Sequence, residues 1–143
     1  MNSSTFNIKT ADDFLNQMVL PQYADFINNN SSSRHALLST ITSYHLYEWV
    51  NCHKFTDSVF KIDYPNHEPL IELFEIARKI TNGTKHFSSK VKTRTQSGFS
   101  SGFSSGFAKP LVITRTDGSE ISADYLLKSL TDFWQEQYKT NGF

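Results

Sequence analysis

The order of apolar and polar positions predicts four helices. Apolar residues recur at spacings of three and four, as on one face of a helix, over 10–27, 33–52, 67–82 and 122–139. Thr10 and Ser122 begin the first and last of these ranges as N-cap residues, with aspartate in the first turn after each. Pro21 is expected to kink or restart the first helix. Residues 53–67 lack the repeat and predict an irregular connection with a short helical turn.

The second predicted helix carries a stripe of mixed polar and apolar side chains. At 100° per residue, one face contains Arg34, Leu38, Ile41, His45, Trp49 and Cys52. Leu46 and Val50 fall well away from this face, so we expect the helix to be buried on more than one side. His45 then has two interpretations: a hydrogen-bonded core residue, or a functional group that pairs with Arg34 on the same stripe.

The third predicted helix ends at Asn82-Gly83, because glycine readily adopts the left-handed conformation that terminates helices. Lys85 and His86 would then lie near the exposed carbonyl groups of the last turn, where cations are favourable. In the functional alternative, His86 transfers a proton or binds phosphate, with Lys85 and Arg78 as charged neighbours. Histidine is the side chain best suited to acid–base catalysis at neutral pH.

Short β-like runs replace the helical repeat after residue 87. Residues 110–121 contain Leu-Val-Ile-Thr, an Asp-Gly pair and Glu-Ile, which is typical of a hairpin. The expected fold class is therefore α+β, mainly α: a three- to four-helix bundle with a small β-hairpin before the C-terminal helix. A flexible tail should precede a single domain over 11–143. The predicted tail, helical part, strap, hairpin and C-terminal helix span 1–10, 11–87, 88–109, 110–121 and 122–139.

Charge is distributed unevenly, although the chain has 14 basic and 14 acidic side chains. Residues 1–77 contain four Lys/Arg against nine acids, and residues 116–143 contain two against five. The segment between them, 78–115, contains eight Lys/Arg and no acid. Such a segment can generate a local positive field that the net charge of zero conceals. It is therefore a candidate binding surface.

Within this basic segment, Ser-Gly-Phe-Ser/Ala occurs three times, which places three phenylalanines four residues apart. Four residues are about one helical turn or two strand periods, so the rings share a face in either conformation. The rings could insert across the helices as pegs, stack on the bases of single-stranded nucleic acid beside the cations, or form a partner-binding strap. The predicted binding residues are Lys85, His86, Lys90, Lys92, Arg94, Phe99, Phe103 and Phe107.

The composition excludes several classes of protein. Cys52 is the only cysteine, so an intrachain disulfide cannot form. No signal-like or membrane-spanning apolar segment is present, which predicts a cytoplasmic protein without membrane association. The five histidines lack the close spacing of zinc ligands, and no nucleotide-binding or hydrolase motif occurs. No metal and no cofactor are predicted.

Several motifs resemble those of a widespread group of small uncharacterised bacterial proteins. They are R-H-A at 34–36, Y-H-L-x-x-W-V at 44–50, I-x-N-G-T-K-H-F at 80–87, the Phe repeat, the Asp-Gly hairpin and F-W at 133–134. The likeness covers 11–138 and implies a fold rather than an activity. Where the group has Ala-Phe in places, this chain has Gly-Phe throughout, which implies a looser strap.

The helical character also resembles that of HEPN ribonucleases, which cleave RNA without metal through an R-x(4–6)-H motif. Here ten residues separate Arg34 from His45, and seven separate Arg78 from His86. Neither pair matches the motif, so this resemblance rests on bundle shape alone.

These observations favour a non-catalytic interaction protein of bacterial or phage origin. Its expected partner is a protein or a single-stranded nucleic acid, bound through the basic, Phe-rich surface. A metal-independent ribonuclease of HEPN type is the alternative, with His86, His45, Arg34 and Arg78 as catalytic candidates. A third hypothesis is an inhibitor carried by a mobile element, which blocks another protein. Self-association into an oligomer is compatible with all three.

Overall fold

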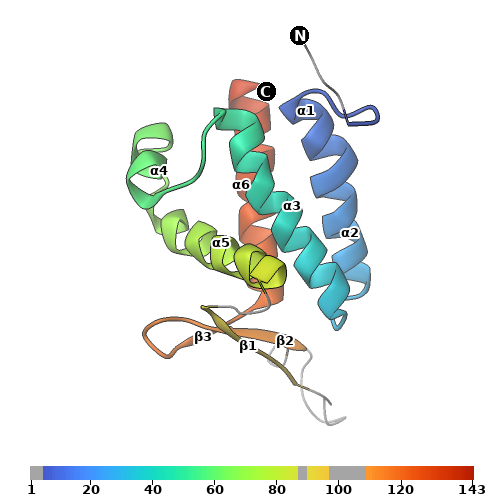
Figure 1. Cartoon of the computed structure of the whole chain (residues 1–143), viewed down its shortest axis with the longest axis vertical. Helices are drawn as coiled ribbons and strands as arrows, with labels where there is room; N and C mark the ends of the chain where they lie inside the picture. Colours follow the sequence, from blue (N-terminus) through green and yellow to red (C-terminus); the bar gives the residue numbers. More distant parts are fainter. Residues whose placement is uncertain (1–4, 87–89, 97–108) are drawn as a thin grey trace.

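The computed structural model describes residues 5–86, 90–96 and 109–143, and it has a mainly helical α+β fold. Five helices pack together, and a three-stranded antiparallel sheet precedes the C-terminal helix (Figure 1). The elements are α1 (Ala11–Phe14), the π-helical turn η1 (Leu15–Val19), α2 (Leu20–Asn28), α3 (Ser33–Asn51), α4 (Asp57–Asp63), the 3-10 turn η2 (Glu68–Leu70), α5 (Ile71–His86), β1 (Lys92–Thr95), β2 (Leu111–Thr114), β3 (Glu120–Ser122) and α6 (Ala123–Asn141). The predicted fold class is confirmed. The helix α4 lies where a short helical turn was expected within 53–67, and the strand β1 is an addition to the predicted fold.

The first helix is continuous through α1, η1 and α2. Thr10 caps it as predicted: its hydroxyl accepts a hydrogen bond from the Asp13 N–H at 3.0 Å, and the Asp13 carboxylate accepts one from the Thr10 N–H at 3.3 Å. Pro21 does not restart the helix. Instead, the helix widens into the π-helical turn η1 shortly before this proline. Two apolar residues of this helix, Met18 and Ile27, are exposed.

α3 lies between α2 and α5, and it buries a different face from the predicted one (Figure 1). Much of the predicted stripe is exposed, whereas its Trp49 packs against the main core. His45 is exposed, so its interpretation as a core residue is wrong. The inner face is rich in small polar side chains, which let α3 approach its neighbours closely. The Trp134 Nε1 of α6 donates a hydrogen bond to the Ser43 carbonyl of α3 at 3.0 Å. The buried residues of α3 are Ala36, Ser39, Thr40, Thr42, Ser43, Tyr44, Leu46 and Tyr47.

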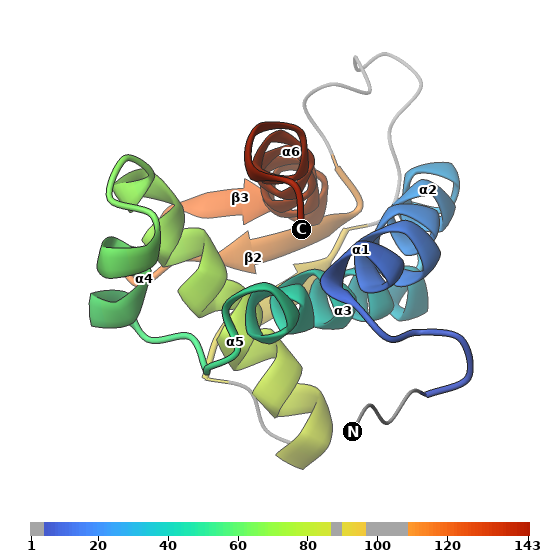
Figure 2. The same ribbon diagram turned by 90° about the horizontal axis from the view of Figure 1, so that it is seen from above.

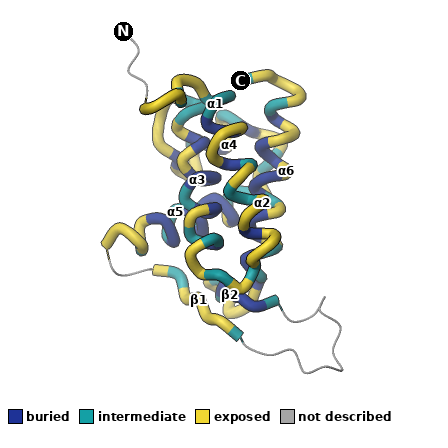
Figure 3. The backbone as a smooth tube through the Cα atoms, turned by 90° about the vertical axis from the view of Figure 1, so that its right-hand side faces the viewer, coloured by how far each residue is buried: buried dark blue, intermediate teal, exposed yellow. Residues whose placement is uncertain are grey.

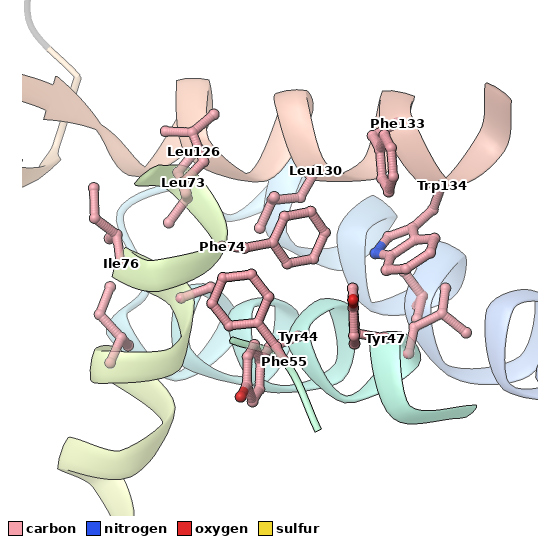
Figure 4. Packing of buried hydrophobic residues seen from close by; sticks show 14 of the residues in the cluster. Tyr44, Tyr47, Phe55, Leu73, Phe74, Ile76, Leu126, Leu130, Phe133 and Trp134 are labelled. Carbon is pink, nitrogen blue, oxygen red and sulfur yellow. The ribbon is translucent and has the colours of Figure 1, made fainter. Parts of the chain in front are cut away.

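The main core is a cluster of aromatic rings between α3, α5 and α6 (Figure 4). Trp134 and Tyr47 are both 0% exposed, and their ring centroids lie 6.5 Å apart. Burial and a hydrogen bond that the Tyr47 hydroxyl donates to Asp63 raise the pKa of this tyrosine. The hydroxyl therefore remains a donor across the physiological pH range. Rings around Tyr47 belong to Phe55, Phe60, Tyr64, Phe74 and Trp134.

The sheet lies at one end of the helical bundle (Figure 1), and its order is β1-β2-β3. The predicted hairpin is confirmed as β2 and β3, in which Ile113 faces Ile121. At its turn, the Arg115 N–H donates to the Ser119 carbonyl at 2.8 Å, and Gly118 adopts a φ of +88°. From above, α6 passes over β2 and β3 (Figure 2). α6 begins directly after β3, because the Ser122 hydroxyl caps it by accepting a hydrogen bond from the Tyr125 N–H at 2.9 Å.

α5 continues through Asn82-Gly83 as far as His86, so the predicted helix stop is wrong. Ile80 and Thr81 are buried immediately before this pair, and α5 packs along α3. A glycine inside a helix costs only about 1 kcal/mol relative to alanine. The packing of this segment outweighs that cost.

Gly83→Ala is expected to raise the free energy of unfolding by about 0.8–1 kcal/mol, because alanine loses less backbone entropy in a helix. Urea unfolding of the two proteins measures the difference. Gly118→Ala provides the opposite control: its positive φ disfavours any side chain, so that variant should be less stable. A destabilised Gly83→Ala protein would show that Gly83 is the left-handed end of the helix after all.

The predicted tail contains a local turn. Thr5 and Ile8 exchange two backbone hydrogen bonds of 3.3 and 3.0 Å, and Ile8 packs against the main core. Across the described parts of the chain, no helix has the length and apolar character needed to cross a membrane.

Candidate functional site

The arginines of the basic segment are each matched by a carboxylate. Arg78 donates to Glu75 through Nε and Nη2 at 2.8 and 2.6 Å. Arg94 donates to both carboxylate oxygens of Glu120 at 3.0 and 2.8 Å. These hydrogen bonds lower the pKa of Glu75 and that of Glu120. A third pair joins Arg115 to Glu72 at 3.2 Å. The positive field predicted from the sequence is therefore partly neutralised.

The lysines of the segment are different, because none of them forms an ion pair with a described residue. Lys79, Lys90 and Lys92 line a cleft of about 770 Å³ between α5 and the sheet, together with Glu72 and Glu75. This cleft carries both signs of charge. The other two lysines are Lys85, at the end of α5, and Lys109, before β2.

The Phe repeat, with Phe99, Phe103 and Phe107, lies outside the described residues. Of the other predicted binding residues, Lys85 and His86 lie at the end of α5. Lys92 and Arg94 lie on the strand β1, and Lys90 lies just before that strand.

A groove between α3 and α5 brings together three residues that the sequence analysis selected separately. His45, Arg78 and Lys85 line this groove of about 620 Å³. Arg34 is exposed near the start of α3, where it contacts its neighbour His35 at 3.5 Å rather than His45. His86 is exposed at the last position of α5 and does not line the groove. The two in-sequence arginine–histidine pairs therefore do not form, whereas His45 and Arg78 share one surface.

One edge of β1 is free of any partner strand among the described residues, a feature that was not predicted from the sequence. The Gln96 N–H donates to the Pro110 carbonyl at 2.7 Å, and β1 pairs Arg94 with Val112 in the same register. Hydrogen-bonded pairs alternate along antiparallel strands, so the backbone groups of Thr93 and Thr95 point away from β2. The structure shows no partner for them among its described residues. All four residues of β1 are exposed (Figure 3).

An apolar groove lies beside this free edge. Thr93 and Thr95 share a face of the sheet with Leu111 and Ile113, which belong to the core. Between this face and the helices is a groove of about 290 Å³. Its apolar side chains come from α3, α5, β2 and α6 and include Ala36, Leu37, Ile80, Leu111, Ile113 and Ala123. The inner side of β1 is thus left open over an apolar surface.

The opposite face of the sheet is charged. Lys92 and Arg94 alternate with the two threonines, so they share the outer face with Val112. Because β2 lies between β1 and β3, the ion pair from Arg94 to Glu120 crosses β2 on this face. Val112 is 6% exposed although it points away from the core. The edge strand therefore presents cations on one side and an apolar groove on the other.

One sequence signal could have revealed this edge. Lys92-Thr93-Arg94-Thr95 alternates long cations with β-branched residues, which is typical of a strand with one solvated face. Its position beside the Phe repeat led us to assign it to a strap instead.

The described residues contain no group of three or more side chains suited to hold a metal ion. Comparison of the chain with family models, with curated proteins and with solved structures gave no match.

Proposed function

We propose that this chain is a non-catalytic interaction protein of bacterial or phage origin that binds an extended segment of a partner protein. The partner segment adds to β1 as a further strand of the sheet. One observation carries this proposal: the free edge of β1 lies directly beside an apolar groove. An unpaired strand edge is a template for another strand, and a neighbouring apolar pocket selects alternate side chains of that strand.

The alternation of side chains on β1 specifies the partner segment. Residues opposite Thr93 and Thr95 would direct their side chains toward the apolar groove, so they should be valine, isoleucine or similar. Residues opposite Lys92 and Arg94 would lie among cations on the outer face, so they should be acidic, because opposite charges across strands are stabilising. The partner is thus an alternating acidic and apolar segment.

The same charges disfavour a second copy of the chain as the partner. Consider two copies that pair antiparallel through β1 and are related by a twofold axis normal to the sheet. Lys92 and Arg94 of both copies would then lie together on the outer face of the joined sheet. Like charges in such positions are destabilising. Nucleic acid is also less favoured, because glutamates already bind the arginines and line the lysine cleft.

Amide NMR with capped pentapeptides tests the proposal. The first peptide has glutamate at positions one, three and five and valine at two and four, and the control has lysine in place of glutamate. The acidic peptide should shift the amide signals of Thr93 and Thr95 and bind more weakly at high salt. The lysine peptide should bind at least about tenfold more weakly, a difference of about 1.4 kcal/mol.

Two results would count against the proposal. One is that the amide signals of Thr93 and Thr95 do not shift when the acidic peptide is present at millimolar concentration. The other is a short oligouridylate that shifts the same amides at a lower concentration than the peptide does, which would make nucleic acid the partner.

The ribonuclease alternative has one observation in its favour, the joint placement of His45 and Arg78 in the groove between α3 and α5. Incubating the protein with total RNA in the presence of a chelator tests it. The alternative is supported if the parent protein and His35→Ala cleave the RNA and His45→Ala does not, since His35 lies outside that groove. If the RNA remains intact, the groove is not a ribonuclease site.

A further inference from the structure

The groove between α3 and α5 has the features of a small-ligand site that is separate from the β1 edge. Its volume of about 620 Å³ is within the range of about 300–1,000 Å³ that small-molecule pockets occupy. The groove is lined by residues of α3, residues of α5 and the connection after α3, whereas the apolar groove lies next to the sheet. The two sites share no lining residue.

Cations outnumber acids in this groove. Lys54, Arg78 and Lys85 line it, against the single carboxylate of Glu48. Neither lysine forms an ion pair with a described residue. The guanidinium of Arg78 uses Nε and Nη2 to bind Glu75, and no hydrogen bond is shown for its Nη1 within the described chain. Two lysine ammonium groups and one guanidinium nitrogen thus remain as donors.

Neutral groups complete the lining. The ring of His45 lies 6.0 Å from that of Tyr44, and burial raises the pKa of Tyr44, which keeps its hydroxyl a donor. Thr81 is 9% exposed, and its buried hydroxyl has no partner among the described residues. Ile41 and Phe55 add apolar area beside the cations. The groove therefore combines hydrogen-bond donors for an anion with apolar side chains.

We infer that the groove binds a phosphomonoester of about the size of a nucleoside monophosphate. The dianionic phosphate would lie between Lys54, Arg78 and Lys85, because charge-assisted hydrogen bonds to phosphate are among the strongest that side chains make. The base would lie against the apolar part of the lining. This inference stands whether or not β1 binds a peptide, and it does not require that RNA be cleaved.

Titration with adenosine monophosphate, followed by amide NMR, tests the inference. The nucleotide should shift the signals of His45, Thr81 and Lys85. Inorganic phosphate should shift the same region more weakly, and adenosine should bind weakest. Lys54→Gln and Lys85→Gln should each weaken nucleotide binding about tenfold, as expected for the loss of one charged hydrogen bond.

Lys139→Gln is the matched control, because Lys139 is also an exposed lysine with no ion pair to a described residue, but it lies on α6. That variant should bind the nucleotide as the parent does. Equal affinity in Lys54→Gln, Lys85→Gln and the control would overturn the inference, and so would adenosine binding as tightly as its monophosphate. Thr93→Pro should leave nucleotide binding unchanged, because Thr93 does not line this groove. The peptide proposal and the nucleotide inference can therefore fail independently of each other.

Discussion

Trp134→Ala is expected to lower the free energy of unfolding by about 3–5 kcal/mol, the range for removal of a fully buried large aromatic side chain. Trp134 is 0% exposed and lies 4.9 Å from the ring of Phe133 and 5.7 Å from that of Phe74. The variant also leaves the buried Ser43 carbonyl without the indole donor. Chemical denaturation measures the loss, and a cost of this size can prevent folding altogether.

Two further variants separate the causes. Trp134→Phe retains a ring but removes the indole N–H, so it should cost less than the alanine variant. Tyr125→Ala, on the exposed side of the same helix, should change stability by no more than about 0.5 kcal/mol. Similar stabilities of Trp134→Ala and Tyr125→Ala would contradict the central place of Trp134 in the core.

Thr93→Pro is expected to abolish binding of the acidic pentapeptide. Proline has no N–H, and its ring would occupy the edge at which the peptide must pair. The N–H of Thr93 points away from β2, so the β1–β2 ladder should remain and the folded state should persist. Calorimetry measures the binding, and circular dichroism measures the melting temperature.

Thr93→Ala is the control for the proline variant, because it keeps the N–H and removes only the side chain. It should bind the peptide within a few-fold of the parent protein. Unchanged binding by Thr93→Pro would show that the peptide does not pair with this edge. A much lower melting temperature of Thr93→Pro than of Thr93→Ala would instead show that β1 needs this N–H for its own folding.

The fold class was predictable because the apolar spacing and the caps agree. Thr10 and Ser122 cap the helices that they were expected to cap, and Asp117-Gly118 lies at the hairpin turn. Local sequence also specifies these features, since each depends on side chains within a few residues. Such features need no knowledge of the neighbouring elements.

The buried face of α3 was not predictable in the same way. Its inner side contains the polar residues Ser39, Thr40 and Ser43, and its outer side contains the apolar residues Leu38 and Ile41. Close approach of neighbouring helices selects small residues, so a rule based on apolar character chooses the wrong face. Gly83 is a related case: a local stop signal is overridden by packing that only the tertiary structure provides.

The candidate sites were predictable only in part. Lys92 and Arg94 were selected for charge, but the role of the intervening threonines depends on which strand edge is free. His45 and Arg78 are separated by more than thirty positions in the sequence and meet only because α3 and α5 pack side by side. Neither juxtaposition is encoded in a local motif, so spacing rules such as R-x(4–6)-H could not find it.

The contribution of α6 to the core affects how the chain folds during its synthesis. Rings from α3, α4 and α5 emerge from the ribosome first, but Phe133 and Trp134, which complete the cluster, follow later. Until α6 has been released, Tyr47, Phe60 and Phe74 lack the partners that shield them from water. Up to that point, the nascent chain should therefore remain exposed to aggregation and to chaperones.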